Sequence, residues 1–154
     1  VAAAGDKAEV VYERGYVGDV TGEYNGVVTG QNLSESRSED KLIADAVAAA
    51  KDADAVIFIG GLNKSAHQDC EDSDRYGLEL PYAQDKAIEA LAAVNPNLTV
   101  VIVSGNAVAM PWVDKVNGIV ETWFLGSQAG HALADVLFGK VNRERDHLVF
   151  SGFG

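Results

Sequence analysis

Hydrophobic positions along the chain fall into short runs that are separated by stretches with helical spacing. Four runs predict strands, at residues 8–12, 55–59, 98–103 and 118–123. The run at 55–59 (AVIFI) is apolar without interruption, which is typical of a strand covered on both faces, and the run at 98–103 (LTVVIV) predicts a second buried strand.

Three stretches predict amphipathic helices, because apolar residues recur in them every three or four positions. Ser36 and Glu39 have the spacing of a capping box before the first helix. Pro81 is suited to the first turn of the second. The third follows Gly126 and ends before Gly139, where a left-handed C-cap is expected. The apolar face of the first helix is formed by Leu42, Ile43, Ala46, Val47 and Ala50.

Strands that alternate with helices predict parallel strands joined by right-handed crossovers. We therefore expect one α/β domain over residues 1–154, a three-layer αβα sandwich with a mostly parallel sheet of at least four strands. Residues 13–37, rich in Gly, Tyr and Ser, predict an irregular surface connection with room for short strands. Loops after successive parallel strands share one rim, so the loop after residue 61 should meet Ser104-Gly105-Asn106 and Phe124-Leu125-Gly126.

Composition excludes several classes of partner. The formal net charge of −11 argues against nucleic acid and against an anionic membrane surface. No apolar run approaches the roughly 18–20 residues that span a bilayer. The opening VAAAGDKAEVV contains no signal segment and suggests a mature or excised fragment. Cys70 is the only cysteine, so no internal disulfide is expected and cysteine usage does not indicate a compartment.

The loop between the glycine pair at 60–61 and Pro81 is the expected functional site. It is about eighteen residues long, and connections of that length in a compact domain are usually functional or disordered. Seven polar or reactive residues lie within nine positions: His67, Asp69, Cys70, Glu71, Asp72, Asp74 and Arg75.

Several chemistries fit this acidic loop poorly. The chain has neither a G-x-G-x-x-G nor a G-x-x-x-x-G-K-[ST] phosphate motif, and so many carboxylates would repel phosphate. The carboxylates depart from the calcium-loop spacing, and a zinc site on His67 and Cys70 lacks paired ligands, so no metal or other cofactor is expected. Cys70 has no identifiable activating histidine. A carboxyl group that donates and accepts a proton is the simpler interpretation, because neighbouring carboxylates favour its protonated form.

Several segments together resemble the second, α/β sandwich domain of glycoside hydrolase family 3. They lie within residues 42–142 and include DADAVIFIGGLN, the E-x-x-D-R-x-x-L-x-L-P run from Glu71, AVNPNLTVVIVSGNAVAMPWVDKVNGIVETWFLGSQAG and ALADVLFGKVN. The resemblance implies a retaining exo-acting β-glucosidase or β-xylosidase, with β-linked glucosides or xylosides as substrates and a periplasmic or secreted location. It also implies a preceding (β/α)8 barrel that carries an aspartate nucleophile, while this domain supplies the acid/base.

The resemblance assigns roles to the acidic loop. The family pattern E-x-E-G-x-D-R corresponds here to residues 69–75, so the acid/base is Asp69 or Glu71, and Asp72 replaces the family glycine. Asp74 and Arg75 match the pattern. They are expected to form an ion pair that fixes the loop and, together with His67, to lie at the substrate site; a solvated loop histidine is equally consistent with His67. Residues 143–154 depart from the family, which usually continues with a P-S-G-K-L-P-like strand.

Other interpretations remain open at this stage. A retaining glycosidase needs two carboxyl groups, and the barrel with the nucleophile is missing, so the chain alone is expected to be inactive. A non-catalytic sugar-binding or structural module is the alternative, and a nucleotide-dependent flavodoxin-like protein is a third. Trp112 and Trp123 suit sugar stacking, but core or interdomain packing is favoured for both, and a structural role is favoured for His131.

Overall fold

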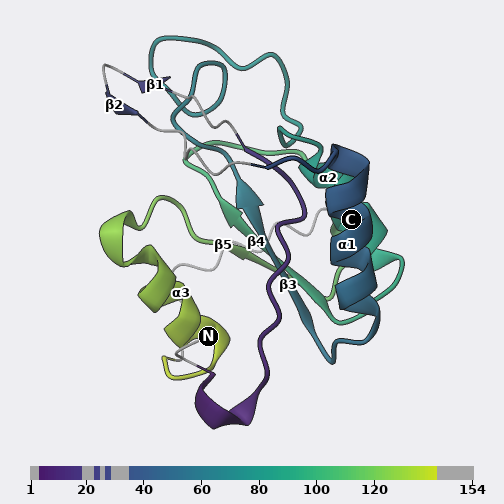
Figure 1. Ribbon diagram of the computed structural model, residues 1–154. Coiled ribbons are helices and arrows are strands. Elements are labelled where there is room, and N and C mark those ends of the chain that lie inside the picture. Colours follow the sequence, from purple (N-terminus) through teal and green to yellow (C-terminus); the bar gives the residue numbers. More distant parts are fainter. Residues whose placement is uncertain (1–3, 19–22, 25–26, 29–34, 142–154) are drawn as a thin grey trace.

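A three-stranded parallel sheet forms the centre of the molecule. The computed structural model describes residues 4–18, 23–24, 27–28 and 35–141. The sheet has the order β3 (Val56–Gly61), β4 (Leu98–Val103) and β5 (Gly118–Glu121), with Phe58 beside Val100 and Val100 beside Ile119. In Figure 1, α1 (Glu39–Lys51) and α2 (Gln84–Ala92) lie on one side of the sheet and α3 (Ala129–Leu137) on the other. This arrangement confirms the predicted α/β sandwich with a parallel sheet.

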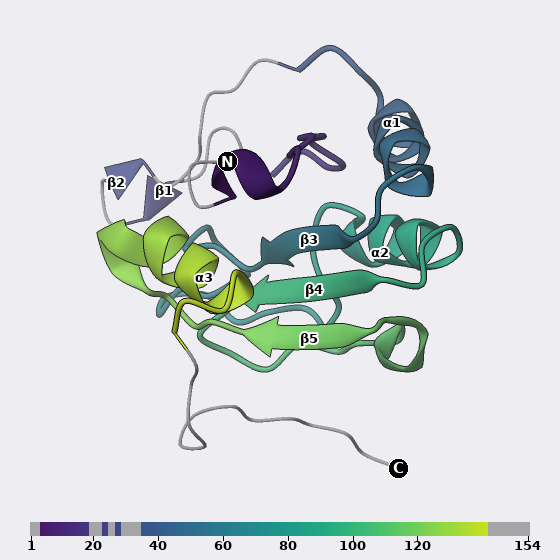
Figure 2. The ribbon, with the colours of Figure 1, turned by 90° about the horizontal axis from the view of Figure 1, so that it is seen from below.

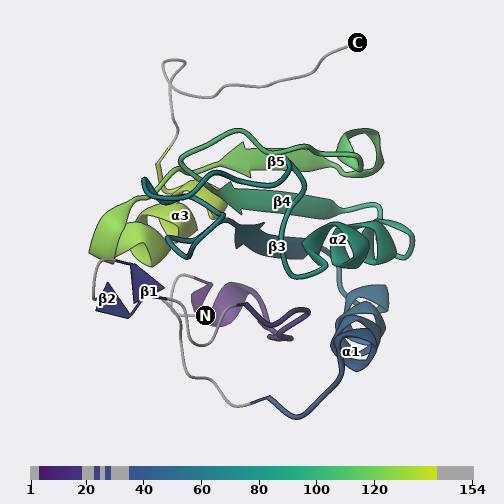
Figure 3. The same ribbon diagram turned by 90° about the horizontal axis from the view of Figure 1, so that it is seen from above.

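Short elements complete the described chain. A two-stranded antiparallel hairpin pairs β1 (Glu23–Tyr24) with β2 (Val27–Val28), within the stretch where short strands were expected. Figures 2 and 3 show this hairpin at the end of the sheet to which the strand arrows point. Single 3₁₀ turns occupy Gly5–Lys7, Val113–Lys115 and Gly126–Gln128. None of the helices in the described part of the chain combines the length and apolar character needed to span a bilayer.

The core lies between the sheet and the helices α1 and α2. Because successive side chains of a strand point to opposite faces, Phe58, Val100 and Ile102 share the face that packs against these helices. The helices contribute their predicted apolar stripes, including Ile43 and Ile88. Trp112 is completely buried in this core, which confirms the packing role expected for it.

The opposite face of β3 is open, so the prediction of a strand covered on both faces is wrong. Ile57 and Ile59 are 46% and 51% exposed, whereas Phe58 between them is buried. The reason is that α3 does not pack closely over this part of the sheet: its main contacts are with the turn Gly126–Gln128 that precedes it.

The strand predicted at residues 8–12 does not form, so the sheet has three strands in the described chain rather than at least four. Val11 and Tyr12 are 68% and 79% exposed and have no strand partner there. The side chain of Tyr16 lies against β3 instead. The Tyr16 hydroxyl donates to the carbonyl of Ile59 at 3.2 Å, and the Tyr16 ring lies 5.6 Å from that of Phe58. Burial, followed by the nearby Tyr12 and Tyr82, raises the pKa of Tyr16 to about 12.

The first helix begins later than the capping box predicts. Its N-cap is Ser38, whose hydroxyl accepts a hydrogen bond from the Lys41 backbone N–H at 3.3 Å, so the pairing of Ser36 with Glu39 is wrong. A local interaction holds the preceding residues outside the helix: the Glu35 carboxylate accepts from both the backbone N–H and the guanidinium of Arg37.

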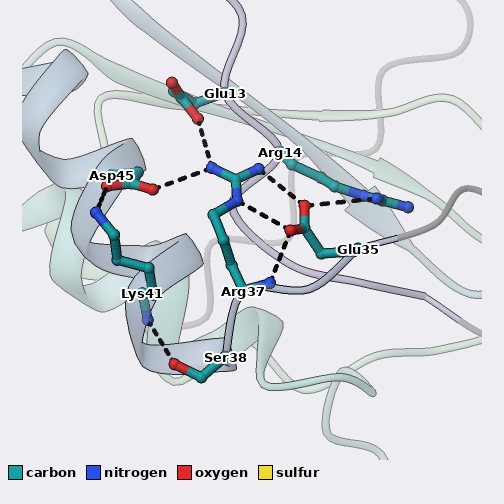
Figure 4. Close-up of polar contacts among 7 residues, drawn as sticks. All are labelled: Glu13, Arg14, Glu35, Arg37, Ser38, Lys41 and Asp45. Carbon is teal, nitrogen blue, oxygen red and sulfur yellow. Dashed lines mark hydrogen bonds and ion pairs between the residues drawn. The ribbon is translucent and has the colours of Figure 1, made fainter.

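Arg37 also ties the N-terminal segment to α1, as Figure 4 shows. Its guanidinium contacts Glu13 at 3.4 Å and Asp45 at 3.0 Å, in addition to Glu35 at 2.9 Å. Hydrogen bonding from Arg37 is the main cause that lowers the pKa of Glu35 to about 2. The same cluster lowers the pKa of Asp45, chiefly through a hydrogen bond from Lys41, and raises that of Arg37.

The second helix starts at Gln84, three residues after the predicted start at Pro81. Tyr82 and Ala83 have φ of 61° and 55°, a left-handed conformation that cannot belong to a right-handed helix. The other predicted boundaries agree more closely: β4 matches residues 98–103, and Gly139 has the expected left-handed φ of 67° after α3. The atypical tail at 143–154 lies outside the described residues.

Candidate functional site

The loops after all three strands of the sheet meet at one rim, as their order along the chain predicted. The Asp69 carboxylate, in the loop after β3, accepts a hydrogen bond from the backbone N–H of Gly105, in the loop after β4. Gly105 lies so close to the Phe124 ring that a β-carbon there would be 3.1 Å from it. The Lys64 ammonium lies 4.4 Å from the centroid of that same ring. In Figure 1 the long loop after β3 extends beyond the arrowheads of the sheet.

The root of the acidic loop is fixed by a buried side chain that sequence analysis missed. Gln84 is 1% exposed, and its amide makes two hydrogen bonds with the backbone of Gly61, accepting from the N–H at 2.7 Å and donating to the carbonyl at 2.9 Å. The helical spacing could have predicted this burial. Gln84 precedes Ala87 and Ile88 by three and four residues, so it lies on the buried face of α2.

The first part of the loop folds back on itself through Asn63. Its carbonyl accepts from the Asp69 N–H at 3.0 Å, and its own N–H donates to the Gln68 side chain at 3.0 Å. The Gln68 amide in turn contacts the Tyr82 hydroxyl. These bonds fix the position of Asp69 from the backbone side, while Gly105 fixes its carboxylate.

The last part of the loop is held by Arg75, although not through the predicted ion pair. In the part of the chain that the structure describes, no ion pair joins Asp74 to Arg75, so that expectation is wrong. The Arg75 guanidinium instead donates to the backbone carbonyls of Ala107 and, at 3.2 Å, Glu79. The N–H of Ala109 also donates to the Leu78 carbonyl at 2.7 Å. Arg75 therefore anchors the loop to the segment that follows β4.

His67 connects the two halves of the loop. Its backbone N–H donates to the Ser73 hydroxyl at 2.9 Å, its Nδ1 lies 2.9 Å from the Asp74 carbonyl, and its Nε2 lies 2.9 Å from the Tyr76 hydroxyl. The His67 and Tyr76 rings also stack, with centroids 4.2 Å apart. Both ring nitrogens are thus engaged within the loop.

The two acid/base candidates have different surroundings. Asp69 is partly buried and its carboxylate is committed to the Gly105 N–H. Glu71 is exposed, and within the described residues its carboxylate has neither a hydrogen bond nor an ion pair. Asp72, next to it, is exposed as well. Glu71 therefore stands at the tip of a loop that is anchored on both sides of it.

The remaining candidates separate into buried and exposed groups. The Trp112 indole N–H donates to Asp85 at 2.7 Å inside the core. Trp123 is 51% exposed and has a left-handed φ of 53°, so core packing is wrong for it. His131 is exposed on α3, and the Cys70 thiol lies 3.1 Å from the Ser73 hydroxyl. Across the described ranges, no group of three or more His, Cys, Asp or Glu side chains is arranged to hold a metal ion.

A cavity of about 210 Å³ opens beside the carboxyl end of β3. Tyr16, Gly61, Asn63 and Tyr82 are among its lining residues, whereas neither Asp69 nor Glu71 lines it. The candidate acids therefore lie outside this cavity.

Comparison with known proteins identifies the family of the chain. The family description "Glycosyl hydrolase family 3 C-terminal domain" matches residues 1–144. The chain belongs to this family. The match extends the resemblance carried by residues 42–142 to the N-terminus.

Relatives of this family 3 domain include enzymes named for two kinds of sugar. A β-glucosidase of Bacteroides ovatus, BoGH3A, is 60% identical over 102 residues, which cover 66% of this chain and 14% of the relative. The crystal structure of a Kluyveromyces marxianus β-glucosidase has a TM-score of 0.65 and 33% identity, covering 70% of this chain and 13% of that one. The structure of a family 3 exo-β-xylosidase in complex with a xylobiose aziridine probe has a TM-score of 0.59 and 31% identity, covering 75% of this chain and 15% of that one.

Proposed function

We propose that this chain is the acid/base-bearing domain of a retaining exo-β-glycosidase that acts on β-linked glucosides or xylosides, and that Glu71 is the acid/base. The named β-glucosidase and β-xylosidase relatives support the reaction class. The chain spans only 14% of the relative from Bacteroides ovatus, which supports a further domain that carries the nucleophile.

The observation that carries the assignment is the exposed carboxylate of Glu71 at the tip of the anchored loop, which has no hydrogen bond or ion pair among the described residues. A general acid must approach the glycosidic oxygen to within hydrogen-bonding distance, and a general base must later approach a water molecule. Asp69 is less suited to both steps, because its carboxylate already accepts from the Gly105 N–H and its backbone is held by Asn63. We assign Asp69 the role of fixing the loop.

In the proposed reaction, the carboxylate of the partner domain attacks the anomeric carbon while protonated Glu71 gives its proton to the departing oxygen. The resulting covalent glycosyl intermediate is then hydrolysed by water, whose proton returns to Glu71. The two carboxyl groups must lie about 5–5.5 Å apart for this retaining reaction. The exposure of Glu71 suits such an arrangement, since a second domain has to bring its nucleophile to the loop.

The test replaces each acid in the full-length protein. Glu71→Ala should reduce cleavage of glycosides with poor leaving groups by about 10²–10⁴-fold, because these need a proton as the bond breaks. Dinitrophenyl glycosides need little protonation, so the covalent intermediate should still form. Azide needs no general base and should restore turnover, giving a glycosyl azide.

Asp69→Asn is the matched control. The amide oxygen of asparagine can still accept from the Gly105 N–H, so this variant should retain most of its activity. Azide rescue of the Asp69 variant instead of the Glu71 variant would exchange the two roles. Absence of rescue in Ala variants of both residues would refute the proposal.

A further inference from the structure

We propose that His67 and Tyr76 form a clasp that positions the tip of the acidic loop for proton transfer, so that His67 is a positioning residue rather than a contact of the sugar. The inference rests on the proposed function, because its purpose is to hold Glu71. The clasp consists of the side chains of His67 and Tyr76 with the Ser73 hydroxyl and the Asp74 carbonyl.

The clasp closes the chain on both sides of Glu71. Residue 67 bonds to residues 73, 74 and 76, so residues 68–72 form the closed tip. Two further attachments hold the flanks of this tip: Asp69 to Gly105 on one side and Arg75 to Ala107 on the other. Glu71 itself is left unbonded in the described chain, so the position of its carboxylate depends on these flanking contacts.

The chemistry of the partner groups limits the donor and acceptor roles of the His67 ring nitrogens. A carbonyl oxygen only accepts, so the proton of His67 resides on Nδ1, which donates to Asp74. Nε2 is engaged by the Tyr76 hydroxyl, which can either donate to it or accept from it. With both nitrogens used, the His67 ring has no free polar atom for a sugar hydroxyl. These hydrogen bonds favour a positioning role for His67 over the contact with substrate that the sequence suggested.

The backbone of His67 is strained in a way that fits such a role. Its φ is 60°, a left-handed conformation that is uncommon outside glycine and is best tolerated by asparagine, aspartate and histidine. Strained residues of this kind persist where surrounding contacts hold them, often at functional sites. Here the contacts are the three hydrogen bonds and the stacked Tyr76 ring.

The experiment uses two variants of the full-length protein that remove parts of the clasp. His67→Asn tolerates the left-handed backbone but loses the imidazole contacts. Tyr76→Phe removes a single hydroxyl from a side chain that is 87% exposed, so folding should be unaffected. Tyr12→Phe is the matched control, because Tyr12 is 79% exposed and lies outside the loop.

The expected result is a loss confined to the proton-dependent step. Since a misplacement of about 1 Å can cost on the order of 10²-fold, we expect His67→Asn to lower kcat for glycosides with poor leaving groups by about 10–10²-fold, and Tyr76→Phe to lower it less. The KM for glycosides with poor leaving groups should change little, and Tyr12→Phe should resemble the wild type. The first turnover of dinitrophenyl glycosides, which forms the covalent intermediate and releases dinitrophenolate, should proceed at near the normal rate, while the later hydrolysis of the intermediate should be slowed.

Three results would overturn the clasp. An increase in KM with unchanged kcat for both kinds of substrate would show that His67 binds the sugar. Equal losses in the first turnover of both kinds of substrate, with a lower melting temperature, would show a merely structural role. Unchanged kinetics in both variants would show that the contacts have no function. Failure of the proposed function has a separate sign, namely a wild-type protein without glycosidase activity or a Glu71→Ala variant without azide rescue.

Discussion

At the scale of single residues, several polar side chains of this domain form hydrogen bonds with backbone groups, and others belong to a cluster of ion pairs. The Gln84 amide satisfies both backbone groups of Gly61, and Asn95 donates to the carbonyls of Ala50 and Ala53 at 2.8 Å each. Buried polar groups are costly unless they are paired in this way. Glu35 is the extreme ionic case, since Arg37 contacts it through the backbone and the side chain.

The depressed pKa of Glu35 predicts a specific loss of stability in acid. The folded-state pKa of about 2 lies below the ordinary glutamate value of 4.5, so the ionised carboxylate stabilises the fold above pH 4.5. This contribution should decline as the pH falls from 4.5 toward 2. Glu35→Gln should therefore be less stable than the wild type at neutral pH, and the difference should shrink in this acidic range. Urea unfolding at several pH values measures it.

Glu9→Gln serves as the control for this prediction, because Glu9 is exposed and takes part in no ion pair within the described residues. It should follow the wild type at each pH. A difference between Glu35→Gln and the wild type that stays constant from neutral pH to about pH 2 would contradict the assigned pKa.

At the scale of elements, the end of β3 is closely packed against its neighbours. A β-carbon on Gly61 would lie 2.0 Å from the Val103 carbonyl oxygen, and one on Gly60 would lie 2.2 Å from the Gln84 side chain. Gly61 also has a φ of 132°, which side-chain-bearing residues rarely adopt. The glycine pair thus allows β4 and α2 to approach the strand just where the acidic loop begins.

Gly61→Ala should consequently lower the free energy of unfolding by at least about 2 kcal/mol, through backbone strain and overpacking. Gly130→Ala is the matched substitution, since Gly130 lies within α3 and a β-carbon there would meet no neighbouring atom within 4 Å. Alanine in a helix interior is favoured by roughly 0.5–1 kcal/mol over glycine, so this variant should be slightly stabilised. Chemical denaturation measures the free energy of unfolding of both variants. Equal changes in Gly61→Ala and Gly130→Ala would contradict the close packing around Gly61.

At the scale of the whole molecule, the chain exposes surfaces that fit a larger protein. Ile57 and Ile59 are half exposed on one face of the sheet, and Trp123, Phe124 and Leu125 are exposed at the rim. The chain spans 14% of its Bacteroides ovatus relative, so most of such a protein would lie outside it. We expect part of this apolar surface to be covered there.

The isolated chain is accordingly predicted not to hydrolyse nitrophenyl β-glucoside or β-xyloside. A retaining reaction requires a nucleophilic carboxylate opposite the acid/base, and the proposal places that carboxylate on another domain. Incubation of the purified chain with either substrate tests this, with the full-length protein as the positive control. Clear turnover by the chain alone would show that it contains both carboxyl groups.

The amino-acid sequence alone determined the layered architecture and the rim at which the loops after the strands meet. Short runs rich in apolar residues identified β3, β4 and β5, because strand burial leaves a local signature in consecutive residues. Helical spacing identified the buried stripes of α1 and α2. Parallel topology then placed Asp69, Gly105 and Phe124 on a common rim, which their contacts confirm.

Only the tertiary structure decided which polar groups pair and which faces are covered. Ile57 and Ile59 belong to an apolar run but lie at a sheet edge, and residues 8–12 have strand character but no partner in the described chain. Arg75 adjoins Asp74 in sequence yet bonds to Ala107. The physical reason is the same in each case: burial and hydrogen-bond partners depend on groups that are distant along the chain, and local periodicity carries no information about them.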